Sequence, residues 1–274
     1  MKRASLLFMA ALLGAPATAL AGEDEEWTFA ATPYLWLPTI EGDLNYDLPP
    51  GSGSPDFEVG PVDWFELLNF AALLAGSANK GRYSVYADFV YLNLQSDGEA
   101  KLNSIGGPDG RIPIEGSLSR EVDTDLTGVQ VSLAGGYRVV DSHNAIVDVL
   151  LGARYFGVET EVNYSLNASI TGPNNEFNFP AKGSLKDDTS SVDVIVGVRG
   201  RQGFDDSRWS LEYQLDVGGG DADFTWNAMA VAAYTFDSGD LLIAYRHLEY
   251  DQGSDGLVQN FSFSGPAFGY RFRF

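Results

Sequence analysis

Cysteine is absent from the 274-residue sequence, and basic residues are scarce, with 17 lysines and arginines against 38 acidic residues. The lack of cysteine excludes disulfides, cysteine-ligated zinc, thiol nucleophiles and the acylated N-terminal cysteine of a lipoprotein. The formal net charge of −21 argues against nucleic acid and anionic surfaces as partners, because basic faces bind phosphate. Any membrane anchor must therefore be the fold itself.

Segments apolar enough to form a membrane-spanning helix are also missing. Uncharged stretches such as residues 67–79 and 224–236 have only 13 residues each. A spanning helix needs about 20 apolar residues, whereas a tilted transmembrane strand needs only about 9–11. The sequence therefore favours strands over helices as membrane-crossing elements.

Residues 1–21, MKRASLLFMAALLGAPATALA, have the pattern of a cleaved secretory signal peptide. Lys2 and Arg3 precede a short apolar segment, and small residues at positions 19 and 21 frame a cleavage point. An uncleaved anchor is the alternative, but the apolar segment is too short and Pro16 breaks it. We therefore expect residues 22–274 to form one exported domain.

Apolar and polar residues alternate along most of this domain, as in a β-strand with two different faces. In residues 208–217, Trp209 and Leu211 fall on one face while Ser210 and Glu212 fall on the other. The alternation predicts ten strands, near residues 27–46, 65–79, 82–96, 120–141, 144–166, 184–204, 207–218, 223–237, 240–252 and 259–274. Residues 63–75 also suit a short amphipathic helix.

The connections between the predicted strands alternate between short and long, so that short turns fall at one end of the barrel and long loops at the other. Longer loops rich in glycine, proline and aspartate alternate with tight turns, which are predicted at residues 79–81, 141–143, 205–206 and 237–240. Bacterial outer-membrane barrels combine short periplasmic turns with long extracellular loops and an even strand number. The expected fold is all-β: a single antiparallel transmembrane β-barrel of ten strands, with eight strands as the alternative and a soluble sandwich as the competing class.

Charged residues of both signs fall opposite the apolar face, and we expect them to line the barrel lumen. They are Asp88, Arg138, Asp148, Arg154, Asp193, Arg199, Arg201, Glu212, Asp216, Arg271 and Arg273. Ionised groups in a narrow interior are costly unless they neutralise one another. The set predicts either a structural network of salt bridges or the lining of a narrow, selective pore.

The last residues, SGPAFGYRFRF, place Phe268, Tyr270, Phe272 and the terminal Phe274 on one face. This pattern resembles the C-terminal signal by which outer-membrane barrels are recognised for insertion. Tyr270, Phe272 and Phe274 are therefore the expected insertion signal, and the barrel-assembly machinery is the expected partner of the C-terminal strand.

Further stretches, among them WTFAATPYLWLPTIEGDL, GRYSVYADFVYLNL and LLIAYRHLEYD, resemble a family of uncharacterised Gram-negative outer-membrane β-barrel proteins of porin-like type. The resemblance covers nearly the whole exported domain. It implies a location in the outer membrane, in contact with its lipid and lipopolysaccharide, and it implies no reaction or cofactor.

Acidic pairs are frequent in the predicted external loops: Asp43 and Asp47, Asp56 and Glu58, Asp97 and Glu99, Asp187 and Asp188, and Asp221 and Asp223. They make calcium or magnesium a candidate partner, with solvated loop charge as the competing interpretation. The ligand spacing and terminal glutamate of an EF-hand loop are missing. No metal or cofactor site is predicted.

Three classes of function stay open: a small-solute pore, a structural or surface-interaction protein, and an enzyme at the outer rim. His247, close to Glu249 and Asp251, is the one candidate general base for the enzyme. A Gly-x-Ser-x-Gly elbow and the paired aspartates of the ten-stranded proteases are absent. We therefore expect a protein that is not an enzyme.

Overall fold

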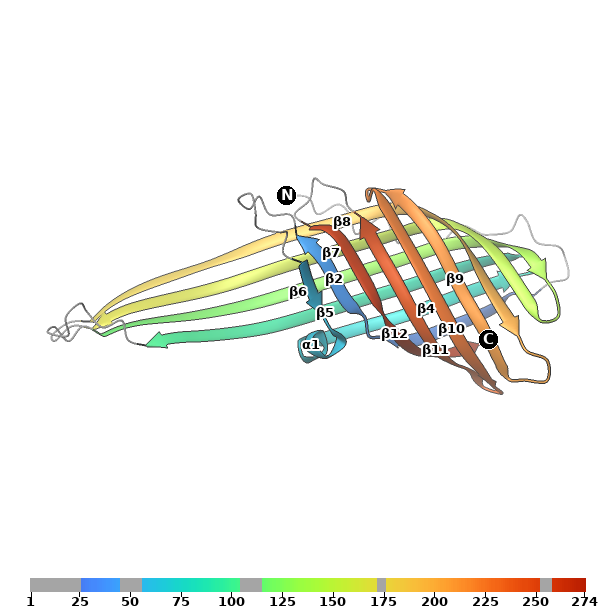
Figure 1. Ribbon diagram of the computed structural model, residues 1–274, viewed down its shortest axis with the longest axis horizontal. Coiled ribbons are helices and arrows are strands. Elements are labelled where there is room, and N and C mark those ends of the chain that lie inside the picture. Colours follow the sequence, from blue (N-terminus) through green and yellow to red (C-terminus); the bar gives the residue numbers. More distant parts are fainter. Residues whose placement is uncertain (1–25, 45–55, 104–114, 172–175, 252–257) are drawn as a thin grey trace.

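The computed structural model describes residues 26–44, 56–103, 115–171, 176–251 and 258–274 (Figure 1). The predicted signal peptide lies outside these residues. The elements are β1 (Thr28–Trp36), β2 (Thr39–Leu44), β3 (Asp56–Val59), α1 (Pro61–Glu66), β4 (Leu68–Lys80), β5 (Tyr83–Asn103), β6 (Glu115–Asp141), β7 (Ala145–Thr171), β8 (Glu176–Gly203), β9 (Trp209–Gly220), β10 (Phe224–Phe236), β11 (Gly239–Asp251) and β12 (Val258–Arg273).

Ten of these strands form a closed antiparallel ring. β1 pairs with β4, β4 to β12 pair in chain order, and β12 returns to β1. Two backbone hydrogen bonds between Phe29 and Phe274, at 3.1 and 2.9 Å, fasten the closing strands. The ten-stranded barrel is confirmed and the eight-stranded alternative is wrong, while β2 and β3 are additional strands outside the ring.

The alternation predicted from the sequence places apolar side chains outward, while the inward side chains include both buried charges and an apolar cluster with Val90, Phe156 and Leu248. Leu151 and Val194 are 65% and 62% exposed, whereas the neighbouring Arg154 and Asp193 are 1% and 0% exposed. The outward set includes Val85, Phe89, Leu133, Val149, Val196, Leu211, Leu215, Ile243 and Phe268. A continuous apolar outer belt, with the charged side chains kept inside, is the distribution that a membrane-spanning barrel requires.

The first predicted strand is interrupted in the structure. Residues 27–46 were expected to form one strand, but the chain breaks between β1 and β2 at Leu37 and Pro38. Pro38 has no N–H to donate, so it cannot continue the ladder. The next predicted element, residues 65–79, is a strand only from Leu68, and the helical alternative over 63–75 is wrong because α1 ends at Glu66.

α1 has six residues. No helix in the described part of the chain is long and apolar enough to cross a membrane.

Strands β5 to β8 are each 4–7 residues longer than the sequence pattern predicts. β6, β7 and β8 have 27, 27 and 28 residues, against 12 or 13 for β9, β10 and β11. Of the expected loops, residues 97–103, 115–119, 167–171 and 176–183 are strand, and Asp97, Glu99, Asp187 and Asp188 lie in strands rather than loops. A strand that extends beyond the membrane can carry polar residues on both faces. Charged residues and glycines in these segments are therefore as compatible with strands as with the loops that were expected.

The four long strands project from one end of the barrel (Figure 1). This end is called the loop end here. The opposite end, where the chain turns at residues 81–82, 142–144, 204–208 and 237–238, is the turn end. Phe274 and the start of β1 also lie at the turn end.

Gly152 allows β7 to pack closely against β6. A Cβ at this position would overlap the carbonyl oxygen of Leu133 and the Cα of Ala134, whereas a Cβ at Gly128 would meet no atom within 4 Å. We expect Gly152→Ala to lower the free energy of unfolding by about 1–3 kcal/mol, since the displaced atoms belong to the backbone. Gly128→Ala is the matched control and should be close to neutral in urea unfolding. Equal unfolding midpoints for the two variants would contradict this close packing.

Candidate functional site: a plugged lumen

Arg154 of β7 lies across the middle of the lumen and is 1% exposed. Its Nη2 lies 2.5 Å from Oδ1 of Asp216 on β9. Its Nε donates to the hydroxyl of Ser132 on β6 at 3.2 Å, and its Nη1 donates to the hydroxyl of Thr225 on β10 at 3.3 Å. One guanidinium group therefore joins four strands.

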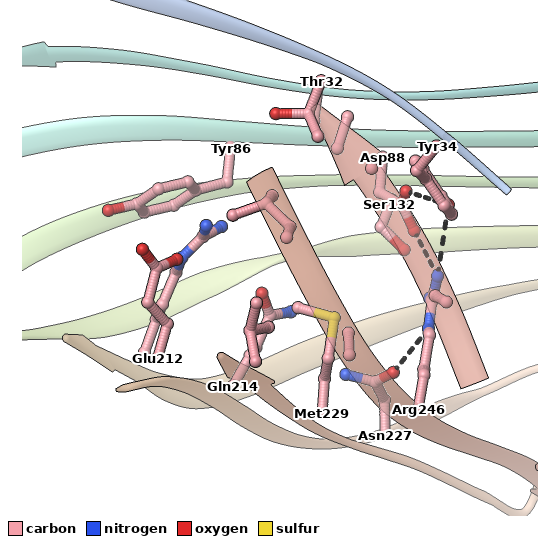
Figure 2. Close-up of a pocket in the computed structure, with 18 of the residues that line it drawn as sticks. Thr32, Tyr34, Tyr86, Asp88, Ser132, Glu212, Gln214, Asn227, Met229 and Arg246 are labelled. Atoms are coloured by element: carbon pink, nitrogen blue, oxygen red, sulfur yellow. Dashed lines mark hydrogen bonds and ion pairs between the residues drawn. The ribbon is translucent and has the colours of Figure 1, made fainter. Parts of the chain in front are cut away.

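Arg246 of β11 makes a second crossing of the lumen. Figure 2 shows its side chain reaching toward Asp88, Tyr34 and Asn227. Its Nη1 lies 2.8 Å from Oδ2 of Asp88, its Nε donates to Oδ1 of Asn227 at 3.0 Å, and its Nη2 donates to Oε1 of Gln130 at 3.2 Å. The Tyr34 hydroxyl donates to the other oxygen of Asp88 at 2.6 Å.

The two arginine groups are linked, because Asn227 also donates to Asp216 at 2.9 Å. We call Asp88, Arg154, Asp216, Asn227 and Arg246 the plug. Each arginine has one carboxylate partner, so the plug is electrically neutral. Buried charge is tolerated when it is paired and its remaining hydrogen-bonding groups are satisfied, and both arginines meet this condition. The space left beside the plug is about 120 Å³.

On the turn side of the plug lies a wide vestibule of about 900 Å³. Basic and acidic side chains alternate around it: Arg138 pairs with Asp148 at 3.3 Å, and Arg271 pairs with Glu212 at 2.6 Å. Arg201 lies 3.8 Å from Glu212. The vestibule therefore carries paired charge rather than a field of one sign.

On the loop side lies an apolar cavity of about 300 Å³, called the outer cavity. The atoms that face it are apolar. Its wall includes Trp36, Trp64, Val90, Leu92, Phe156, Val158, Leu248 and Phe263. The plug thus separates a charged vestibule from an apolar cavity.

The other residues predicted to line the lumen have separate roles. Asp193 accepts the N–H of Ala222 at 2.9 Å and so fastens the connection between β9 and β10. Arg199 lies over the ring of Tyr86, with 4.4 Å between its Cζ and the ring centroid. Arg273 lies 3.3 Å from Asp240 at the turn end.

Sequence reasoning missed Arg246 and Asp240, although both are buried. Arg246 lies in β11, where both alternating faces are largely apolar, so the pattern did not show which face points inward. Asp240 was assigned to a tight turn, but it begins β11 and faces Arg271 at 3.5 Å. The sequence did contain a signal for Asp240. Arg271 and Arg273 of the last strand were expected to lie in the lumen, where each of them needs an acidic partner.

At the loop end, His247 lies on the outward face between two polar neighbours. Its Nδ1 is 2.5 Å from the hydroxyl of Ser264, and its Nε2 is 3.3 Å from Oε2 of Glu249. Trp226 packs against the ring and donates to the same carboxylate at 2.9 Å. Serine, histidine and carboxylate stand in the order of an acyl-transfer triad. Ser264, however, lies inside β12 between His247 and Thr39, so its backbone belongs to a ladder rather than to an exposed turn.

The residues of the expected insertion signal lie in and directly after β12. Phe272 and Phe274 are exposed, and the Tyr270 hydroxyl lies 2.6 Å from the hydroxyl of Ser238. Recognition by the assembly machinery stays a prediction.

Among the described residues, no group of three or more histidine or acidic side chains could hold a metal ion. Asp221 instead accepts the N–H of Val192 at 2.9 Å, and Asp47 lies outside the described residues. Binding of divalent cations by the acidic pairs stays a prediction.

A neutral plug inside a closed ring with an apolar outer belt decides the fold class. The chain has an outer-membrane β-barrel fold. No family model and no curated protein matches it.

Several solved structures resemble the barrel. The translocator domain of autotransporter NalP from Neisseria meningitidis is 14% identical, with 97% of this chain and 92% of that chain covered and a TM-score of 0.38. Outer membrane protease OmpT from Escherichia coli is 11% identical, with 94% and 99% covered and a TM-score of 0.42. Ail from Yersinia pestis is 12% identical, with 90% and 99% covered and a TM-score of 0.28. These similarities carry no information on activity.

Removing one partner of the plug should be costly. We expect Arg154→Met to lower the free energy of unfolding by about 3–5 kcal/mol, because Asp216 would remain buried without its cation. The double variant Arg154→Met, Asp216→Leu should recover most of this loss, since an apolar pair replaces the ionic pair. Urea unfolding in lipid vesicles measures both. A double variant less stable than Arg154→Met would contradict the pairing.

Two lumen tyrosines give a second, matched test. The Tyr250 hydroxyl is buried and has no hydrogen-bond partner among the described residues, whereas the Tyr34 hydroxyl donates to Asp88. Tyr250→Phe should leave the free energy of unfolding unchanged or raise it. Tyr34→Phe should lower it by about 1.5–3 kcal/mol, because a hydrogen bond to a charged group is lost. The same vesicle assay separates the two, and equal losses would contradict the assigned contacts.

Proposed function

We propose that this protein is a closed outer-membrane barrel that acts at the cell surface as an interaction protein, and that it does not form an open pore. The observation that carries the proposal is the plug. Arg154 and Arg246 cross the lumen with every partner inside the protein, and only about 120 Å³ is left beside them. A hydrated ion has no continuous polar path through such an interior.

The projecting sheet supports a surface role. A tilted transmembrane strand needs about 9–11 residues, and β6 to β8 exceed this by more than a factor of two. Short turns mark the periplasmic side of outer-membrane barrels, so the loop end faces outward. The sheet then stands outside the membrane beside lipopolysaccharide, which is its expected neighbour.

Apolar side chains on one face of the projecting sheet add to this support. Val162 on β7 is directly opposite Leu185 on β8, and Leu185 is 65% exposed. On the other face, Lys186 is hydrogen-bonded to Glu159. An exposed apolar pair on one face, with an ion pair on the other, is suited to contact with another macromolecule on the apolar side.

A narrow pore is the second candidate. The vestibule and the outer cavity lie on the two sides of the plug, so displacement of a few side chains would join them. This function would require the arginine pairs to open.

We also propose that the barrel is not an enzyme. The His247 group lacks a feature that acyl transfer needs, namely free backbone donors next to the nucleophile, because Ser264 lies within a regular ladder. Unchanged rates of ester and phospholipid hydrolysis, relative to empty vesicles, are the expected result. Hydrolysis that disappears in Ser264→Ala would overturn this part of the proposal.

Conductance in planar bilayers tests the closed barrel. The refolded wild type should stay at baseline current. A charge-balanced variant with Asp88, Arg154, Asp216 and Arg246 all changed to alanine should give discrete steps, because the crossing side chains are gone. The matched control removes an exposed ion pair instead, with Glu159→Ala and Lys186→Ala, and should stay silent.

Discrete steps from the wild type would overturn the closed-barrel proposal and favour the narrow pore. Heat-modifiable migration on gels confirms that each variant has folded before its current is measured.

A further inference from the structure

The outer cavity has the size of a small-molecule site. Its volume is about 300 Å³. A cavity of roughly 150 Å³ lined by leucine, isoleucine and phenylalanine is enough to take benzene, and ligand pockets begin at about 300 Å³. The space therefore suits a molecule of one or two rings.

The chemistry of the wall is uniform. Aromatic rings from Trp36, Phe156, Phe261 and Phe263 face the cavity together with aliphatic side chains, and the facing atoms are apolar. Gln95, Ser96, Thr124 and Gln130 also border the cavity but present no polar atom to it, so desolvation of a charged or strongly polar ligand would not be offset there. The wall selects a neutral, apolar ligand.

The base of the cavity is fixed by packing. Phe156 stacks on Tyr250 with 4.6 Å between ring centroids, and Phe263 meets Phe156 edge to face at 5.9 Å. Below them, Arg246 lies over the ring of Trp36, with 4.8 Å between its Cζ and the ring centroid. Arg246 of the plug therefore contacts Trp36 at the base of the cavity, and the other rings pack against one another.

One wall of the cavity is not a strand ladder. The pairing of β1 with β4 ends at Pro33 and Leu74, and β4 then continues with β5 alone. Trp64 of α1 lies at this place, buried to 1% exposure, and its indole N–H donates to the carbonyl of Pro38 at 2.7 Å.

Apolar side chains surround this wall on the outside. Val62, Phe65 and Phe70 are 74%, 54% and 57% exposed. In a membrane-embedded barrel these side chains contact lipid at the outer interface. Trp64 therefore separates the outer cavity from an apolar outer surface, and both lie on the loop side of the plug.

We propose that the outer cavity is a binding site for one small neutral hydrocarbon of one or two rings, with Trp64 as its membrane-side wall. This site goes beyond the surface role proposed above. It does not require conduction, so a silent bilayer and a filled cavity are compatible.

Calorimetric titration of toluene into the folded protein in detergent micelles tests the site, with the same micelles lacking protein as the blank. We expect saturable heat with one site per chain. Benzoate has nearly the same size but carries a charge, and it should bind at least about 100-fold more weakly because its carboxylate would be desolvated. A toluene heat no different from that of empty micelles would overturn the proposal.

Matched variants locate the binding. Val90 faces the cavity and is 5% exposed, whereas Val85 on the same strand faces outward and is 42% exposed. Val90→Trp should lower toluene affinity at least tenfold, and Val85→Trp should leave it unchanged. If Val90→Trp does not fold, Val158→Trp fills the same space from β7. Equal affinities for the cavity and outward variants would place toluene elsewhere and overturn the proposal.

Titrations in two detergents, with chains of eight and fourteen carbons, identify the competing occupant. Toluene affinities that agree between the two detergents, after correction for partitioning of toluene into the micelles, support a small-molecule site. Binding that is lost in the long-chain detergent would show that an acyl chain fills the cavity, and it would overturn the small-hydrocarbon assignment.

Discussion

The neutral pairing of Arg154 and Arg246 with carboxylates inside the lumen is the constraint on which the rest of the structure depends. At the level of the plug, the ten-stranded ring leaves only about 120 Å³ of free space, so the charges there must be paired. The pairs join β1, β5, β6, β7, β9, β10 and β11 across the ring. They also support Trp36 and divide the lumen into a charged vestibule and an apolar outer cavity.

The alternation of apolar and polar residues made the closed ring of strands predictable from the sequence. Each spanning strand has to present one face to lipid and the other to the lumen, and this requirement is visible in single segments such as residues 208–217. The strand number followed from counting such segments. The partner of each buried charge could not be predicted, because the contact of Arg154 with Asp216 depends on the register of two strands, β7 and β9, that are separated by β8.

Beyond the lipid-facing belt, the sequence pattern no longer distinguishes strands from loops. The extensions of β5 to β8 stand beyond the apolar belt, so their charges and glycines were compatible with loops as well as strands. The outer cavity was invisible for a different reason. Its wall combines α1 with residues of seven strands, and residues such as Trp64 and Phe156 show no pattern in the chain that would bring them together.

The absence of cysteine permits a direct test of the closed lumen in intact cells. Single cysteines would replace Leu94, which faces the outer cavity, and Ser77, which faces the vestibule. With a membrane-impermeant maleimide added outside, we expect labelling of Leu94→Cys, and labelling of Ser77→Cys only after the outer membrane is permeabilised. Labelling of both at similar rates in intact cells would contradict the plug.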